Sequence, residues 1–216
     1  MKTDKFAVIT GDVIKSSKLT AGELSRLPAV FVQVVNEVDK ICKQPAGTTK
    51  FSIFRGDSFQ ILTPPVCAIK ALLILRAELR KTYPKTIANA VDVRTAVAIG
   101  TVNHFADNIT ESTGEAFTKS GHLLDKLPHS RQTIFGSAFP ETDKELNTSL
   151  SLADEIIRKW TSSQSALISY LLSGLTQQEI ALKTGSTQPT ILRKVKSMGW
   201  QGISDLLIRY DEINQI

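Results

Sequence analysis

The sequence predicts an α+β fold in two parts, on two observations. Up to residue 128 the hydrophobic residues alternate between strand-like and helix-like periods, whereas from residue 141 onwards they follow only the helical period. All nine phenylalanines lie at or before Phe139, and both tryptophans, Trp160 and Trp200, lie after it, which indicates two cores. We therefore expect an α+β domain over residues 1–150 and an all-helical domain over residues 151–216.

The first domain is predicted element by element from the spacing of its apolar residues. In chain order we expect a strand at 6–10, a helix at 22–42, two strands joined by a hairpin within 51–63, a helix at 66–82, a strand at 91–100 and a helix at 114–127. Pro28 is tolerated only near a helix start, and Pro84 and Pro128 follow helix ends. The order β-α-β-β-α-β favours a ferredoxin-like arrangement, an antiparallel sheet with helices on one face, because its connections are short.

The second domain is predicted to contain helices only. They are expected at 141–160, 162–173, 176–184, 188–198 and 201–213, separated by short polar or glycine-containing breaks. Residues 151–216 carry seven Lys or Arg and six Asp or Glu, a net charge of +1, which leaves +4 of the total +5 to the first domain. The helical domain is therefore not a basic tail.

The segment from Leu175 to Lys196 is the most specific motif of the sequence. Thr176 and Glu179 have the spacing of a capping box, and Gly185 suits the positive φ of a short turn. This pattern resembles a bacterial helix-turn-helix. Its second helix would present five polar or basic side chains to DNA bases and phosphates: Gln188, Thr190, Arg193, Lys194 and Lys196. The alternative is a plain helical hairpin used for packing or dimerisation.

Two aspartates are candidate metal ligands. Asp12 follows the first apolar strand, and Asp57 lies at the tip of the hairpin, so a central first strand would place both at one edge of the sheet. Two carboxylates suit a hard cation such as Mg²⁺ or Mn²⁺, with nucleotide phosphates completing its ligands. The residues expected to contact those phosphates are Lys15, Ser16, Ser17 and Arg55. Taken singly, a strand end and a turn also explain the two aspartates.

The order of these motifs resembles the catalytic domain of class III nucleotidyl cyclases and, more closely, the SatD family of bacterial proteins. The shared motifs are the strand-ending Gly11-Asp12, the hairpin Gly56-Asp57 and the glycine-led helix that begins at Gly114, within residues 6–128. The resemblance implies that Asp12 and Asp57 bind metal ions, that the glycine-led helix carries transition-state residues, and that the site forms between two protomers.

Three positions depart from the cyclase pattern. Ile53 stands where a lysine would recognise the base, and Thr118 and His122 stand where the transition-state Asn and Arg would be. Without a fixed cation over the developing charge, cyclisation loses its main electrostatic aid. His122 also has the simpler explanation of a packing or surface residue. The resemblance therefore implies nucleotide or phosphate–metal binding rather than cyclase turnover.

Composition excludes several classes of protein. With 42% hydrophobic and 22% charged residues the chain is typical of a globular protein. Its longest apolar run, residues 71–75, is far shorter than the roughly 18 residues that span a bilayer. Two cysteines are too few for a disulfide framework or a four-cysteine zinc site. We expect a cytoplasmic protein with no membrane partner.

These features favour a regulatory protein in which the N-terminal domain senses a nucleotide or divalent metal and the helix-turn-helix binds DNA. Both resemblances imply a homodimer. The alternative is a Mg²⁺-dependent enzyme that acts on nucleoside phosphates through Asp12 and Asp57, with the helical end used only for assembly. A third hypothesis is an interaction protein in which both motifs are relics.

Overall fold

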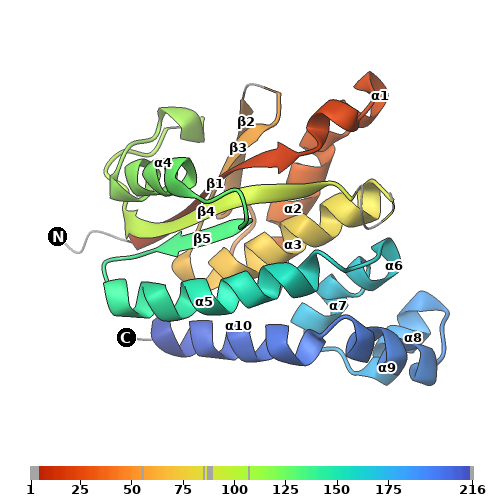
Figure 1. The fold of residues 1–216 in the computed structure, drawn as a ribbon. Helices are drawn as coiled ribbons and strands as arrows, with labels where there is room; N and C mark the ends of the chain where they lie inside the picture. The colour runs from red at the N-terminus through yellow and green to blue at the C-terminus, as the bar shows by residue number, and fades with distance from the viewer. Residues whose placement is uncertain (1–4, 55, 85, 87–89, 107, 215–216) are drawn as a thin grey trace.

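The computed structural model describes residues 5–54, 56–84, 86, 90–106 and 108–214, which form an α+β protein (Figure 1). A five-stranded sheet consists of β1 (Lys5–Ile14), β2 (Lys50–Phe54), β3 (Ser58–Thr63), β4 (Asp92–Thr101) and β5 (Thr133–Gly136). The strand order is β2-β3-β1-β4-β5, so β1 lies in the centre of the sheet. All neighbours are antiparallel except β4 and β5, which makes the sheet mixed.

The helices follow the expected order, with some divided in two. The α-helices are α1 (Ala21–Leu24), α2 (Leu27–Ile41), α3 (Ala68–Thr82), α4 (Glu115–Lys126), α5 (Pro140–Ile157), α6 (Ser162–Ser165), α7 (Ile168–Leu172), α8 (Gln177–Thr184), α9 (Gln188–Ser197) and α10 (Trp200–Asn214). Short 3₁₀ turns are η1 (Ser16–Lys18), η2 (Pro65–Cys67) and η4 (Ile109–Glu111). Pro28 falls in the first turn of α2, as its fixed φ predicts. No helix in the described part of the chain has the length and apolar character needed to cross a bilayer.

Two sequence expectations about the sheet are wrong. The sheet is not wholly antiparallel, because β5 pairs with β4 in parallel. The sequence does not predict this strand, since four residues are too few to show a period and its pairing is set by tertiary contact. The expectation of helices on one face also fails. Alternate residues of β1 point to opposite faces, and Ala7 packs in the core that contains α2 and α3, whereas Val8 packs with Ala116 of α4. Helix α4 therefore covers the second face.

One continuous core joins the sheet to the start of the helical region. Phe31 and Phe59 lie in the same buried cluster as Trp160 and Tyr210. Helix α5 crosses position 150 without a break, and Figure 1 shows it side by side with α10 beneath the sheet. Residues on either side of position 150 therefore pack in the same core, and the division of the chain into two domains there stays a prediction. A smaller cluster under α7, α8 and α9 is separate from this core.

A buried ion network ties α5 to the sheet. Arg76 of α3, which is fully buried, donates from Nε to Asp92 Oδ1 at 2.8 Å and from Nη1 to Asp154 Oδ1 at 2.5 Å. Arg80, one helical turn later, donates to Asp92 Oδ2 at 2.5 Å. Asp154 also accepts the backbone N–H of Thr133 at 2.9 Å, so one carboxylate holds α5 against β5. Two arginines and two aspartates balance their charge inside the protein, as buried ions require.

The pKa of Asp92 shows which force prevails in this network. Burial alone would raise the pKa of the carboxyl group, because it penalises the charged form. The guanidinium groups of Arg76 and Arg80 outweigh burial and hold the pKa of Asp92 below its ordinary value. Asp92 is therefore ionised at neutral pH, and the fold depends on that charge.

Candidate functional site

The two predicted metal ligands lie at the same end of the sheet. Asp12 stands opposite Ser58 in the β1–β3 register, and Asp57 is the residue immediately before Ser58. The backbone N–H of Val13 donates to the carbonyl of Asp57 at 3.0 Å, which holds the hairpin against β1. Contrary to the sequence expectation, Asp12 does not follow its strand but lies within it, because β1 continues to pair as far as Ile14. The structure thus places the backbones of the two aspartates next to each other at this end of the sheet.

Each carboxylate is fixed by one serine and keeps one oxygen available. Ser58 Oγ donates to Asp12 Oδ1 at 2.7 Å, and Ser16 Oγ donates to Asp57 Oδ2 at 2.7 Å. The other oxygen of each aspartate accepts no hydrogen bond from the described residues. Within those residues no group of three or more His, Cys, Asp or Glu side chains could hold a metal ion. A cation bound here would therefore take water or phosphate oxygens as its remaining ligands, as Mg²⁺ commonly does.

Gly11 has a structural explanation that Asp12 lacks. A Cβ atom at position 11 would lie 2.4 Å from the carbonyl oxygen of Arg94 and 2.9 Å from Cζ of Phe59. Only glycine fits between these two strands. The glycine of the Gly-Asp motif is thus required by the sheet itself, whereas the half-buried carboxylate of Asp12 faces the side covered by α4, as Val8 and Thr10 do.

The predicted phosphate-binding residues separate into two groups. Ser16 joins the carboxylate pair through Asp57, and Ser17 is exposed in the same 3₁₀ turn. Lys15 adopts the left-handed backbone conformation, with φ of 64°, and lines a different cavity, next to Arg80. Arg55 lies outside the described residues. The structure therefore unites Ser16 with the candidate metal ligands and directs Lys15 elsewhere.

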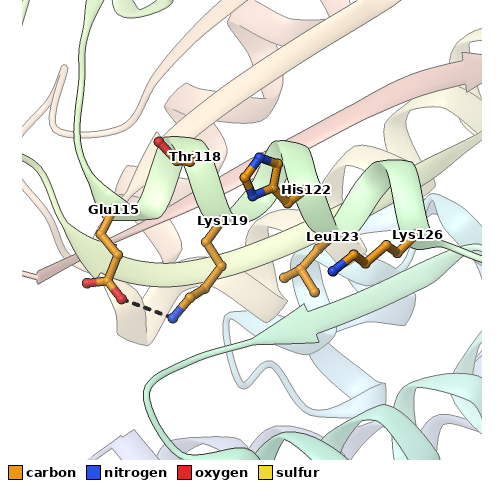
Figure 2. A pocket seen from close by; sticks show the side chains of 6 residues that line it. All are labelled: Glu115, Thr118, Lys119, His122, Leu123 and Lys126. Carbon is orange, nitrogen blue, oxygen red and sulfur yellow. Dashed lines mark hydrogen bonds and ion pairs between the residues drawn. The ribbon is translucent and has the colours of Figure 1, made fainter.

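The outer face of α4 carries Thr118 and His122, which the expected resemblance aligns with the cyclase transition-state residues. Thr118 and His122 are exposed and line a hollow of about 490 Å³. In Figure 2 they project from one side of α4, while Glu115 and Lys119 meet on the other side in an ion pair of 3.0 Å. Thr118 Oγ1 donates to the carbonyl of Gly114 at 3.3 Å. Neither residue is a permanent cation, and the lysines that line the same hollow are Lys119, which is paired with Glu115, and Lys126.

Ile53, which the expected resemblance aligns with the base-recognition position, packs against the edge of the core. It is half-buried in β2 and packs against the main hydrophobic cluster. An aliphatic side chain cannot donate or accept a hydrogen bond, so it cannot distinguish one base from another by that means. Ile53 itself therefore cannot recognise a base by hydrogen bonding.

Helices α8 and α9 form a compact pair joined by a three-residue turn. The predicted capping box is present: Thr176 accepts the backbone N–H of Glu179, whose carboxylate accepts the backbone N–H of Thr176. Gly185 ends α8 with φ of 63°, and the N–H of Ser186 donates to the carbonyl of Ala181 at 2.9 Å. The glycine is needed because this left-handed conformation is unfavourable for side chains with a Cβ. The turn therefore forms as its local signals predict.

A separate apolar cluster holds α9 in place under its polar surface. Its buried members come from two helices, α8 and α9, and from the residue before α7: Leu167, Ile180, Ala181 and Ile191. Thr187 is the N-cap residue of α9, but its hydroxyl donates to Thr190 Oγ1 at 2.9 Å and caps no backbone N–H. The second helix of the pair is thus fixed by packing, and its outer side chains remain available.

The predicted DNA-binding residues are presented on α9. Gln188, Arg193 and Lys196 are exposed, whereas Thr190 and Lys194 are half-buried. No acidic residue occurs between Gln188 and Ser197, and in the described chain no carboxylate forms an ion pair with the three cations of α9. Arg193 donates only to Thr190 Oγ1, at 3.4 Å. The basic side chains are therefore free to meet an external anion.

Comparison of the chain with protein-family models and with curated proteins finds no match. The assignment of function therefore depends on the residues and on their geometry.

Four residues near the candidate sites could not be identified from the sequence: Ser58, Arg80, Arg158 and Lys159. Ser58 holds Asp12, and Arg80 joins Arg158 and Lys159 around a cavity at the end of β1. One local signal existed for Arg80: two arginines, four residues apart, interrupt an otherwise apolar helix. The other three gave no signal, because their partners are distant in the chain.

Proposed function

We propose that this chain is a DNA-binding regulatory protein. In this proposal α8 and α9 form a helix-turn-helix, and the sheet domain senses a nucleotide, with Mg²⁺ or Mn²⁺ held by Asp12 and Asp57. The observation that carries it is the surface of α9, where three basic residues and two hydrogen-bonding residues lie together without a carboxylate among them. Glutamine and arginine pair with adenine and guanine edges, and lysine pairs with phosphate.

The low net charge of the helical region does not weaken this proposal. The region has a net charge of +1, but its acidic residues are engaged with partners away from α9. Their partners are Arg76 for Asp154, Arg158 for Glu155, the α8 cap for Glu179, Gln201 for Asp205, Lys70 for Asp211 and Arg209 for Glu212. None of these interactions involves a cation of α9, so its three basic residues keep their charge for an external anion.

The finer description of the sheet domain belongs to the proposal as well. The antiparallel order β2-β3-β1-β4 supports a ferredoxin-like βαββαβ unit, to which α4 and β5 are added. That order is consistent with the resemblance to class III cyclases and to the SatD family. The proximity of Asp12 and Asp57 supports a metal-bound nucleotide phosphate as the ligand. A homodimer, expected from both resemblances, is part of the same proposal.

The DNA-binding proposal is tested by the salt dependence of affinity. Fluorescence anisotropy with a labelled mixed-sequence duplex should give a dissociation constant that rises steeply with salt. Removal of one phosphate contact in Arg193→Ala or Lys194→Ala should lower the slope of log K against log salt by about 0.9. Lys144→Ala removes the same charge from an exposed site on α5 and should leave the slope unchanged.

Two results would overturn the proposal. One is the absence of DNA affinity in the wild type at low salt. The other is an equal loss in Lys144→Ala, because that would mean that only the overall charge matters.

A second candidate function is a Mg²⁺-dependent enzyme acting on nucleoside phosphates. The observation that favours it is the pair of fixed carboxylates, each with one oxygen that accepts no hydrogen bond from the described residues. The enzyme should release phosphate from nucleoside triphosphates only with Mg²⁺ or Mn²⁺, and Asp57→Asn should abolish the release. Asp125→Asn, which alters an exposed carboxylate on α4, is the matched control. Turnover that persists in Asp57→Asn would exclude this function for the site.

A further inference from the structure

Leu192 lies exposed within the polar surface of α9. Gln188, Leu192 and Lys196 are four residues apart, so they follow one strip along the helix, and all three are exposed. The leucine keeps 48% of its surface accessible to solvent. It is not part of the cluster that holds α9, in which Ile191 is buried and Val195 is half-buried. Leu192 therefore adds an apolar group to the same surface as the predicted DNA-binding side chains.

The residues around Leu192 indicate what it can contact. An exposed leucine by itself is ordinary, but this one has Arg193 directly beside it and no acidic residue within its helix. The side chain of Gln188 makes no hydrogen bond to the described residues, and Arg193 donates only to Thr190, at 3.4 Å. Cations, an available amide and an apolar side chain suit a partner that offers anions, hydrogen-bonding edges and apolar groups together. The major groove of DNA offers all three, because phosphates border it and thymine carries a C5 methyl group there.

The distance along the helix matches the spacing of base pairs. Four residues of an α-helix rise about 6 Å, and successive base pairs are about 3.4 Å apart. With the Gln188 amide on one base pair and α9 following the groove, Leu192 would meet a base roughly two pairs away. Glutamine pairs with adenine, whose partner is thymine, so an A·T pair suits Gln188 by its adenine and Leu192 by its methyl group.

We propose that Leu192 contacts a thymine methyl group in the major groove, so that α9 selects DNA with an A·T pair at that position. The inference rests on the DNA binding proposed above and adds to it a base that the helix selects. Burial of one methyl group against a leucine side chain should change affinity about fourfold, from the usual free energy of burying one carbon group. The contact requires neither the nucleotide nor the metal ion proposed for the sheet domain.

Uracil in place of thymine tests this contact, because uracil pairs in the same way and lacks only the methyl group. Two labelled duplexes of alternating sequence, one of adenine and thymine and one of adenine and uracil, present the same base pairs to α9 in every register. Fluorescence anisotropy of the full chain at low salt should show about fourfold weaker wild-type binding to the uracil duplex. Leu192→Ser should bind both duplexes equally, since a short hydroxyl side chain buries no methyl group.

Leu182→Ser is the matched control. Leu182 lies on α8 and is 79% exposed, so the same change there removes an exposed leucine outside the strip of α9. This variant should keep the wild-type preference for thymine. Circular dichroism of both variants should report an unchanged fold, because neither side chain is buried.

The possible failures separate this inference from the function on which it rests. Equal wild-type affinity for the two duplexes would overturn the thymine contact and leave the DNA-binding proposal standing. Wild-type binding to neither duplex would refute DNA binding, and the contact with it. A thymine preference that persists in Leu192→Ser, or that Leu182→Ser abolishes, would assign the methyl contact to another residue. Equal weakening on both duplexes in Leu192→Ser, with the fourfold ratio kept, would leave the leucine only a packing role.

Discussion

Helices α3 and α9 both carry clusters of basic residues, and they use them in opposite ways. Arg76 and Arg80 of α3 are buried and bonded to Asp92 and Asp154. The cations of α9 reach the surface and have no carboxylate partner among the described residues. The total charge of +5 cannot separate these two cases. Burial and the presence of a counter-charge decide whether an arginine holds the fold or meets a ligand.

The two helices also differ in how strongly they are tied to the sheet. Helix α3 packs in the main core and is bonded to α5 through Arg76 and Asp154. Helix α9 rests on a small cluster of its own, with only Met198, just after its end, in the main core. Damage to α3 should therefore unfold the protein as a whole, whereas changes near α9 should have smaller, local effects.

The largest effect should come from Arg76. Its replacement by methionine leaves Asp92 and Asp154 buried without their main counter-charge, which should lower the free energy of unfolding by about 3–5 kcal/mol. Urea denaturation followed by circular dichroism measures the change. Lys144→Gln, which breaks the exposed pair with Glu141, should cost less than about 1 kcal/mol. Equal stability of Arg76→Met and the wild type would show that the network does not hold α5 to the sheet.

Acid should lower the stability that the buried ion network of α3 contributes and should leave the stability of α9 unchanged. The pKa of Asp92 is lower in the folded protein than in the unfolded chain, so the unfolded chain binds more protons in acid. The stability that this carboxylate contributes is fully present above about pH 4 and is lost as the pH falls through the folded pKa. Denaturation curves recorded between pH 7 and pH 2 should show this loss.

Two variants check the origin of the acid effect. Asp92→Asn should be less stable at neutral pH and should lose less further stability on acidification. Lys194→Ala should follow the wild-type pH profile, because no acidic residue lies on α9. A wild-type profile as flat as that of Asp92→Asn would contradict the assignment.

The smallest effect should come from the turn before α9. Gly185→Ala places a Cβ in the left-handed conformation, with no neighbouring atom within 4 Å, so only the conformational cost of about 1 kcal/mol is expected. The same change at Gly22, inside α1 and equally free of neighbours, should be neutral or slightly stabilising. Thermal unfolding of both variants tests this difference in sign. A cost as large as that of Arg76→Met would mean that α9 is not locally stabilised.

Local chemistry explains what could be predicted from the sequence. The capping box at Thr176, the glycine at position 185 and the period of the apolar residues each act within a few residues, so α8 and α9 were predicted nearly to the residue. The hairpin that carries Asp57 was predicted for the same reason. The prediction that both aspartates lie at one edge needed only a central β1.

What could not be predicted depends on contacts between distant residues. Arg76 bonds to Asp154, which lies 78 residues later in the chain. Arginine and aspartate are common at protein surfaces, so their residue types alone do not indicate a buried ion pair. Strand β5 exists because four residues pair with β4, and the cavity beside Arg80 exists because α3 and α5 converge there. The continuation of β1 past Asp12 is likewise set by its partners, since strand length depends on the neighbouring strands as much as on sequence.

Trp160 gives the molecule a natural fluorescent probe of its own junction. The indole is 1% exposed, its backbone carbonyl accepts a hydrogen bond from Arg80, and its Nε1 donates to the carbonyl of Met198, just after α9. The wavelength of indole emission depends on the polarity around the ring. The emission of Trp160 therefore reports on its contacts with Arg80 in α3 and with Met198 at the end of α9. Replacement of Trp200 by phenylalanine would leave Trp160 as the single tryptophan of the chain. Binding that changes these contacts can then be followed by the intrinsic fluorescence of Trp160, without any label.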